Sequence, residues 1–475
     1  MEIHESSKTK IIATIGPASA PVNKLQGLIY SGIDLCRLNF SHGSYREHEE
    51  VILRIKEINE RLGSHIALLA DLQGPKIRLG TVEEGVEVQK DDEVILSIRD
   101  GVGTKDMLPI NYPELPGDVK KGDILLVDDG TLKFRVESTN GKDQIKTRVI
   151  YGGSVKSHKG VNLPHTKISI PSLTEKDKRD VDFILDHDFD WIALSFVRSA
   201  KDILGLKKII RQKKKNTLVI AKIEKPEALD DLDEIIAESD AVMVARGDLG
   251  VEVSFEKVPL IQKQIVQKCI QRSTPVIIAT QMLESMIYHF RPTRAEANDV
   301  ANAVFDCADT VMLSGETSVG NFPVESIQCM QRIIDYAEGT GFVHDHSYAP
   351  SKESDTYLQD SACYNACKMA DQSGAKAIVA FAAKPQTAFR LACNRPNAPI
   401  YIFTHDPVTR RQMSLVWGVK TFYIESNRDM DSALEYSIKT LKNKKLLDKG
   451  DLIVQVSSIP LFDFEGVSAI KLSYV

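Results

Sequence analysis

Short apolar runs alternate with amphipathic stretches over most of the chain, from Lys8 to about Tyr336. The apolar runs are rich in Val and Ile, which is typical of strands buried on both faces of a parallel sheet. Eight such strands alternating with helices predict a closed (β/α)₈ barrel, and the count of eight favours it over an open doubly wound sheet. The clearest predicted helices cover 44–61, 174–186, 226–238 and 323–336. The predicted strands are Lys10–Ile15, Asp34–Leu38, Ile66–Leu72, Trp191–Leu194, Leu218–Ile223, Ala241–Ala245, Val276–Ala279 and Thr310–Leu313.

The connection after the third predicted strand is unusually long. It runs from about Pro75 to Ser169, is rich in Val, Ile, Gly and Asp, and contains turn signals such as Glu84-Gly85 and Asn140-Gly141. This pattern predicts an all-β module inserted into a barrel loop. A polar stretch at 344–354 reads as a linker, and a second α/β alternation follows it. The predicted domains are the barrel at 1–74 and 170–343, the inserted lid at 75–169 and a C-terminal α/β domain at 344–475.

Composition sets the broad class of protein. The 475 residues carry a formal net charge of −6, which argues against binding to nucleic acid or to an anionic membrane. The first residues, Met1 to Glu5, lack a basic region before an apolar run, and no apolar stretch reaches the ~20 residues needed to cross a bilayer. Seven cysteines in so long a chain indicate reduced thiols. We therefore expect a cytoplasmic protein.

Polar and charged side chains follow nearly every predicted strand, where a parallel barrel has its active site. Lys222 and Glu224 stand two apart and so face the same side of their strand, and Asp248 follows the next strand. Such carboxylates suit Mg²⁺, with Mn²⁺ as a second candidate, because Mg²⁺ takes one or two carboxylates and completes its shell with substrate oxygens and water. A structural ion-pair network is the alternative. The glycines at 247 and 250 permit close approach of an anion and favour the metal.

Arg37 and Lys222 would surround a transferring group with positive charge. Phosphoryl transfer depends on positioning and charge neutralisation more than on covalent chemistry by the protein. The chain has no Gly-x-x-x-x-Gly-Lys-Ser/Thr loop, so a kinase activity would differ in kind from that of the P-loop enzymes.

Several segments resemble, in order and spacing, the motifs of pyruvate kinases over about Lys8 to Ile334. Any one motif is modest evidence, whereas the whole set is highly specific. The inserted β module and the C-terminal α/β part also match that family's barrel, lid and C-terminal domain. The resemblance implies transfer of the phosphoryl group of phosphoenolpyruvate to ADP, giving pyruvate and ATP in glycolysis. The matching segments are Ile12–Ser19, Arg37–Gly43, Gly74–Arg78, Ala221–Glu224, Val244–Gly250, Ala279–Met286, Pro292–Glu296 and Leu313–Thr317.

The resemblance also implies roles for single residues. Glu224 and Asp248 match the protein ligands of the catalytic Mg²⁺. Lys222 matches the group that stabilises the transferring phosphoryl and the developing enolate, and Arg37 matches the phosphate-binding arginine. Thr280 matches a substrate-site residue near the carbon that is protonated.

The remaining substrate groups are expected around these residues. The amides of Gly247 and Asp248 match the site of the phosphoenolpyruvate carboxylate. The inserted lid would close over the nucleotide and exclude water. The residues expected to line the phosphate and nucleotide region are Asn39, His42 and Arg78. The residues expected to line the monovalent-cation region are Asn39, Ser41, Asp71, Leu72 and Lys76.

Two positions in the cation region depart from the family's common pattern. Lys76 stands where many members carry a glutamate, and Leu72 stands where many carry a threonine. A lysine ammonium can place its own charge where K⁺ would sit, so we expect that K⁺ is not required. The alternative is that Lys76 extends into solvent and K⁺ still binds.

Assembly and regulation are also expected from the resemblance. It implies a homotetramer with Arg294 near a barrel–barrel contact. The loop 382–387 lacks the Ser-Gly phosphate loop of sugar-phosphate-regulated members, so fructose 1,6-bisphosphate is not expected to activate the enzyme. Lys384, Thr387 and Arg390 leave open a different phosphorylated effector.

Two other functions stay open at this point. One is another Mg²⁺-dependent barrel enzyme of pyruvate or phosphoenolpyruvate chemistry, a lyase or an aldolase, which would need neither the lid nor the segment 37–41. The other is a non-catalytic regulatory relative. Loss of Lys222, Glu224 or Asp248 would indicate the latter, and all three are present.

Overall fold

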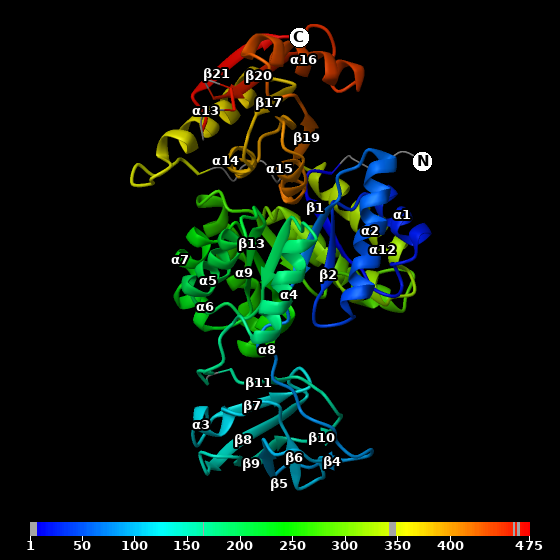
Figure 1. Cartoon of the computed structure of the whole chain (residues 1–475), viewed down its shortest axis with the longest axis vertical. Helices are drawn as coiled ribbons and strands as arrows, with labels where there is room; N and C mark the ends of the chain where they lie inside the picture. The colour runs from blue at the N-terminus through cyan, green and yellow to red at the C-terminus, as the bar shows by residue number, and fades with distance from the viewer. Residues whose placement is uncertain (1–6, 165, 342–347, 459–460, 463–465) are drawn as a thin grey trace.

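The structure is a computed structural model. It describes residues 7–164, 166–341, 348–458, 461–462 and 466–475. Residues 1–6, where no secretory leader was expected, and residues 344–347 of the predicted linker lie outside the described residues. The molecule is elongated, with the inserted sheets at one end, the barrel in the middle and the C-terminal sheet at the other end (Figure 1). In the part of the chain that the structure describes, no helix is both long and apolar enough to span a membrane.

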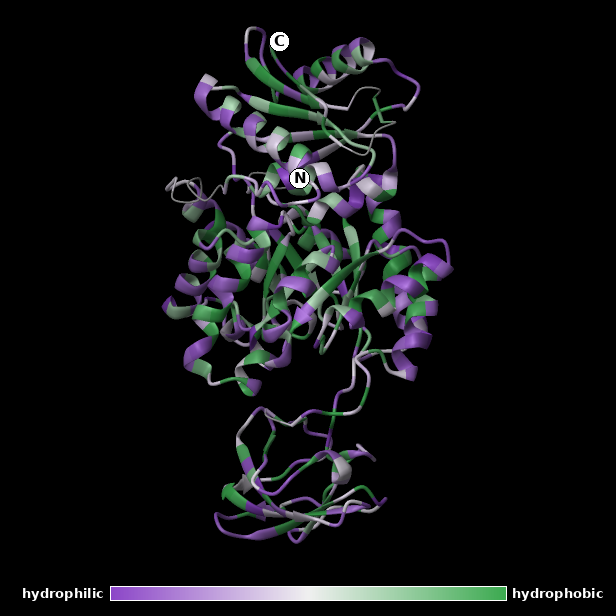
Figure 2. Cartoon of the chain, turned by 90° about the vertical axis from the view of Figure 1, so that its left-hand side faces the viewer, coloured by the Kyte–Doolittle hydropathy of each residue, from purple (hydrophilic) through white to green (hydrophobic). Residues whose placement is uncertain are grey.

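Eight parallel strands close into a barrel in the order β1-β16-β15-β14-β13-β12-β3-β2, which confirms the predicted architecture. Each strand begins and ends within one residue of its prediction. Side chains on both faces of the strands are buried because helices cover the outside, as continuous apolar runs require. Figure 2 shows green strands inside a ring of helices with mixed colouring. The strands are β1 (Lys10–Thr14), β2 (Leu35–Asn39), β3 (Ala67–Asp71), β12 (Trp191–Leu194), β13 (Leu218–Ile223), β14 (Ala241–Ala245), β15 (Val276–Ala279) and β16 (Thr310–Leu313).

Several barrel helices begin with a capping box. Ser44, Thr174 and Thr293 each cap the helix that follows, and an acidic side chain three residues on bonds back to the cap amide. Each box satisfies two backbone N–H groups that the helix leaves without a partner. The longer barrel helices are α1 (Val22–Tyr30), α2 (Tyr45–Leu62), α4 (Glu175–Asp186), α5 (Ala200–Gln212), α9 (Val258–Gln271), α10 (Arg294–Phe305) and α12 (Pro323–Glu338).

The single helix predicted over 226–238 is wrong, because two helices occupy this stretch. α6 (Glu227–Asp230) and α7 (Leu232–Glu238) are divided at Asp231. The carboxylate of Asp231 accepts a hydrogen bond from the backbone N–H of Ala200, at 2.9 Å. This tertiary contact fixes Asp231 outside helical geometry, and the local apolar spacing does not reveal it.

The insertion is built of strands, as predicted, with one short helix, α3 (Leu115–Asp118). A six-stranded sheet has the order β11-β7-β8-β9-β5-β6, and a two-stranded sheet pairs β10 with β4. Its own apolar core includes the buried rings of Tyr112 and Phe134. The strands are β4 (Glu87–Val88), β5 (Glu93–Ser97), β6 (Met107–Pro109), β7 (Ile124–Val127), β8 (Leu132–Thr139), β9 (Gln144–Tyr151), β10 (Gly153–Ser154) and β11 (Val161–Asn162).

The C-terminal part contains a five-stranded sheet of order β19-β18-β17-β20-β21, in which only β21 runs antiparallel to its neighbour. The sequence predicts strands here at 377–382, 400–403 and 452–456, so the three inner strands were expected and the outer strands β19 and β21 were not. The strands are β17 (Ala377–Phe381), β18 (Ile400–Thr404), β19 (Val419–Tyr423), β20 (Leu452–Ser457) and β21 (Ala469–Tyr474). The helices are α13 (Tyr357–Ser373), α14 (Gln386–Ala392), α15 (Pro407–Gln412) and α16 (Met430–Asn443).

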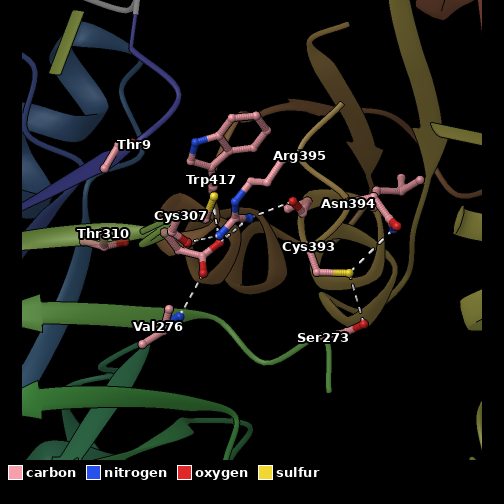
Figure 3. Close-up of polar contacts among 12 residues, drawn as sticks. Thr9, Ser273, Val276, Cys307, Thr310, Cys393, Asn394, Arg395 and Trp417 are labelled. Atoms are coloured by element: carbon pink, nitrogen blue, oxygen red, sulfur yellow. Dashed lines mark hydrogen bonds and ion pairs between the residues drawn. The ribbon is translucent and has the colours of Figure 1, made fainter. Parts of the chain in front are cut away.

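Arg395 joins the C-terminal part to the barrel (Figure 3). Its side chain is fully buried and donates to Asp309 Oδ1 at 3.0 Å and to the carbonyl oxygen of Cys307 at 2.5 Å. The guanidinium carbon also lies 5.0 Å from the ring centre of Trp417. Because Asp309 directly precedes β16, this contact holds the amino end of the barrel, opposite the end where the site residues gather.

Candidate active site

Arg37, Asp71 and Lys222 form a buried charge cluster on three barrel strands. Arg37 Nη2 lies 2.6 Å from Asp71 Oδ2, and Lys222 Nζ lies 3.2 Å from Asp71 Oδ1. Each oxygen of the carboxylate therefore faces one cation. Burial alone would raise the pKa of Asp71, but the charges of Lys222 and Arg37 outweigh it and hold that pKa below its ordinary value. The two cations thus favour the ionised form of the buried Asp71 carboxylate.

Lys222 has two further partners. Its ammonium donates to Ser195 Oγ at 2.7 Å and lies 2.8 Å from Glu224 Oε1. Burial would lower the pKa of Lys222, but the carboxylates of Asp71 and Glu224 raise it above its ordinary value. A permanent positive charge is therefore fixed at the carboxyl end of the barrel.

Glu224 and Asp248 lie near enough for the charge of Asp248 to act on Glu224. Glu224 is 1% exposed, and its Oε2 accepts a hydrogen bond from the backbone N–H of Phe196 at 2.7 Å. Its other oxygen, Oε1, is ion-paired with Lys222 but accepts no hydrogen bond of good geometry. Burial, and then the nearby charge of Asp248, raise the pKa of Glu224, while Lys222 opposes them. Asp248 lies in the first turn of α8 (Arg246–Glu252).

This carboxylate pair fits a magnesium site. Among the residues that the structure describes, no group of three or more His, Cys, Asp or Glu side chains could hold a metal. A two-carboxylate site matches Mg²⁺, whose remaining ligands come from substrate oxygens and water.

Thr280 follows β15 in a strained turn. Its φ is +71°, in the left-handed region that a β-branched residue rarely adopts, and Gln281 follows at +55°. Thr280 Oγ1 accepts a hydrogen bond from the N–H of Gly247 at 2.7 Å. The amide expected to meet a substrate carboxylate is therefore already bonded to another predicted site residue.

A second group of positive charges lies around His42. Burial and then the charges of Arg78, Lys76 and Arg37 lower the pKa of His42. Arg78 also donates to the carbonyl oxygen of His158 at 3.0 Å, within the inserted part of the chain. This region therefore offers cations to a phosphate from both the barrel and the lid.

The five residues predicted for the monovalent-cation region lie at or just past the ends of β2 and β3. Asn39 Oδ1 accepts from the N–H of Ser41 at 3.0 Å, and Leu72 packs in the apolar core outside the strands. Lys76 is half-buried and, within the described ranges, forms no ion pair with Asp71. The predicted role of Lys76 as a cation in place of K⁺ therefore stays a prediction.

Sequence reasoning missed several side chains of the site. Thr14 Oγ1 accepts a hydrogen bond from Arg37 at 2.8 Å, and Ser195 Oγ accepts one from Lys222 and donates to the carbonyl oxygen of Leu72 at 2.7 Å. Both hydroxyls stand at or just past strand ends. That position was the available signal, and a role was assigned to neither.

Comparisons with known proteins agree with this geometry. The family model described as pyruvate kinase, barrel domain, matches residues 6–327, and the model described as pyruvate kinase, alpha/beta domain, matches residues 360–471. A pyruvate kinase of Corynebacterium glutamicum is 44% identical over 95% of this chain and 94% of its own length. One of Geobacillus stearothermophilus is 39% identical over 98% of this chain and 80% of its own.

A solved structure is also similar. The crystal structure of a pyruvate kinase from Cryptosporidium parvum superimposes with a TM-score of 0.91 at 33% identity, covering 98% of this chain and 96% of that one. The chain therefore belongs to the pyruvate kinase family, and it is a phosphotransferase that transfers the phosphoryl group of phosphoenolpyruvate to ADP, giving pyruvate and ATP in glycolysis.

Proposed function

We propose that Lys222 and Arg37 bind the transferring phosphoryl group and that Lys222 also stabilises the developing enolate. The observation that carries this assignment is the buried ammonium of Lys222, in contact with Asp71, Ser195 and Glu224. A fixed cation in a site shielded from water stabilises developing negative charge more strongly than one in solvent. Arg37 supplies a second cation, which is held in place by its ion pair with the same carboxylate, that of Asp71.

We further propose Glu224 and Asp248 as the protein ligands of a divalent cation, Mg²⁺ or Mn²⁺. Two observations support this choice: Glu224 Oε1 accepts no hydrogen bond of good geometry beyond its ion pair with Lys222, and the charge of Asp248 acts on Glu224 from nearby. When bound, the cation neutralises phosphate oxygens and helps orient the substrate. The chain's own part is to hold the two carboxyl groups near Lys222 at the carboxyl end of the barrel.

The substrates are assigned to the two sides of this cluster. Gly247, Asp248 and Thr280 are proposed for the carboxylate end of phosphoenolpyruvate, which requires the Gly247 N–H to leave Thr280 Oγ1 or to be shared with it. Asn39, His42 and Arg78 are proposed for the phosphates of ADP and ATP. The Arg78 contact with His158 supports a role for the inserted sheets as a lid over the nucleotide, where they exclude competing water.

We propose that K⁺ is not required. Both oxygens of Asp71 are already engaged by Arg37 and Lys222, so little negative charge is left there for a monovalent cation. Lys76 adds a charge whose influence reaches His42. Like charges a few ångströms apart repel by roughly 4 kcal/mol near a protein surface, which disfavours an added K⁺.

The proposed assembly is a homotetramer located in the cytoplasm, with neither nucleic acid nor a membrane as a partner. Arg294 is exposed at the start of α10, and two large exposed rings precede it, Tyr288 (74% exposed) and Phe290 (60%). Such rings beside a cation suit burial against a second copy of the barrel. The proposed domains are 1–74 with 170–343, 75–169 and 344–475.

The test of the whole assignment is a coupled assay for pyruvate with and without ADP and Mg²⁺. We expect pyruvate only when phosphoenolpyruvate, ADP and the metal are all present. Pyruvate formed without ADP would indicate a lyase or a hydrolase, and no pyruvate under any condition would indicate a regulatory relative. Either result would refute the proposed roles.

A further inference from the structure

A second buried ion pair lies next to the candidate metal ligands and outside the charge cluster. Lys225 Nζ lies 2.6 Å from Glu252 Oε1, and the two side chains are 6% and 0% exposed. Removing two charges from water is costly, so such a pair calls for a reason beyond stability. Lys225 directly follows Glu224, and Glu252 stands four residues after Asp248, on the same face of α8. The pair therefore connects the two segments that carry the candidate ligands.

An asparagine of the inserted sheets reaches the same carboxylate oxygen. Asn162 Nδ2 donates to Glu252 Oε1 at 2.9 Å. Asn162 ends β11, where it pairs with Leu126 of β7 in the six-stranded sheet. In Figure 1, α8 lies at the end of the barrel that faces β11. A movement of the inserted sheets is therefore transmitted directly to Glu252.

The contact zone leaves little room for other partners. Asn162, Lys225, Asp248 and Glu252 line one cavity of about 20 Å³ between the lid and the barrel. Glu252 Oε2 is buried and accepts no hydrogen bond from the described part of the chain. Glu252 is thus held through Oε1 alone, by one group of the barrel and one group of the lid.

We propose that Asn162, Glu252 and Lys225 form a latch that couples docking of the inserted sheets to binding of the divalent cation. The three act as positioning residues, and the proposal rests on the assignment of Glu224 and Asp248 as cation ligands. With the sheets docked, Asn162 fixes Glu252 and with it the end of the helix that presents Asp248. With the sheets displaced, Glu252 keeps only Lys225. Linkage makes this coupling reciprocal. If docking of the lid raises the affinity for the cation by some factor, binding of the cation raises the equilibrium constant for docking by the same factor.

The test uses the full chain and Mn²⁺ as the probe, without substrates. Mn²⁺ affinity is measured from the electron paramagnetic resonance signal of the free ion. Lid docking is measured by amide hydrogen exchange of the two connecting segments, 75–80 and 158–164, with and without Mn²⁺. In the wild type, we expect Mn²⁺ to slow exchange in both segments.

The variants separate the latch from its surroundings. In Asn162→Ala, we expect the Kd of Mn²⁺ to rise about fivefold or more and the protection by Mn²⁺ to vanish. Glu252→Gln keeps the shape of the side chain but removes its charge and so the ion pair with Lys225. We expect it to raise the Kd of Mn²⁺ more than Asn162→Ala does and to abolish the protection as well. Asn365→Ala is the matched control, since Asn365 is exposed on α13 and its amide bonds only the carbonyl of Ser361, at 2.8 Å. It should keep both wild-type values.

The outcomes distinguish the latch from the ligand assignment. Wild-type Mn²⁺ affinity together with wild-type protection in Asn162→Ala and Glu252→Gln would overturn the latch. If Asp248→Ala also binds Mn²⁺ normally, the proposed cation ligands are wrong as well. If Asp248→Ala loses Mn²⁺ while the two latch variants stay normal, only the latch fails. A purely structural role would lower thermal stability without changing the response to Mn²⁺.

Discussion

Lys222→Met is the sharpest single test of the charge cluster. Methionine keeps the length and apolar stem of the side chain but removes the ammonium, and with it the contacts to Ser195, Asp71 and Glu224. Arg37 stays in place because it is held independently by Asp71 and by Thr14, at 2.8 Å. The substitution therefore removes one of the two cations that we propose to bind the transferring group and leaves the other.

The structure sets the expected size of each effect. Loss of a preorganised electrostatic stabiliser lowers kcat by about 10²- to 10³-fold. The KM for phosphoenolpyruvate should change less than tenfold, because Arg37 still binds the phosphate. Removing one partner of a buried ion pair costs about 3–5 kcal/mol. We expect about 3 kcal/mol here, because Asp71 keeps Arg37 and because burial already raises the pKa of Glu224, which makes its protonation easier.

The assay compares steady-state kinetics and thermal unfolding of Lys222→Met with a matched variant, Lys207→Met. Lys207 pairs with Asp240 at 2.9 Å, just before β14 and therefore at the opposite end of the barrel. The control should lose at most about 1 kcal/mol of stability, as partly exposed pairs do, and should keep wild-type kcat. The reasoning would be refuted if the kcat of Lys222→Met were within threefold of the wild type. It would also be refuted if Lys222→Met lost no more stability than Lys207→Met.

Four further results are expected. Asp248→Ala and Glu224→Ala should each reduce turnover to near the detection limit in the coupled assay, because either change removes a proposed ligand and leaves phosphate charge uncompensated. Activity in tetramethylammonium chloride should equal activity in KCl at the same ionic strength, and Lys76→Glu should create a K⁺ requirement; strong stimulation of the wild type by K⁺ contradicts this. Fructose 1,6-bisphosphate should not shift the phosphoenolpyruvate saturation curve, since the Arg390 guanidinium is engaged by Asp360 at 2.8 Å, and a clear leftward shift would show the opposite. Light scattering should give the mass of a tetramer, and a monomer would exclude the proposed assembly.

The barrel was predictable because its strands are buried on both faces and are therefore composed almost entirely of apolar residues. Runs such as Ala241–Ala245 are apolar at every position, so no register needs to be known to identify them. The two missed strands of the C-terminal sheet lack this signal. β21 is an edge strand with few buried side chains, and β19 contains a lysine and ends in an exposed tyrosine. The division at Asp231 was invisible because a contact with Ala200, distant in sequence, creates it.

The site was predictable only where the strand-end rule applies. It selected Arg37, Asp71 and Lys222, which the structure brings into contact. The rule says nothing about which charges pair, so it did not reveal that Arg37 and Lys222 both engage Asp71. The pair of Lys225 and Glu252 escaped for a similar reason, since charges just past a strand and at a helix end look like solvated positions. Burial of Lys225 and Glu252 comes from tertiary contacts, including the bond from Asn162 of the inserted sheets, which the sequence around these two residues does not reveal.

The pairing around Glu224 also explains how a strongly charged site can be buried before substrate arrives. Glu224 Oε1 is both the oxygen nearest to Lys222 and the oxygen that accepts no hydrogen bond, so it can serve either Lys222 or a bound cation, but not both equally. Asp71 and Ser195 hold Lys222 from its other contacts, so the ammonium keeps its place when Glu224 is engaged elsewhere. The proposed role of Lys222 therefore requires its ammonium to exchange one carboxylate partner for a phosphate at a position that is already buried. We expect the contact between Lys222 and the phosphoryl group to strengthen as that group moves. An interaction that is stronger in the transition state than in the bound substrate raises kcat and does not merely tighten binding.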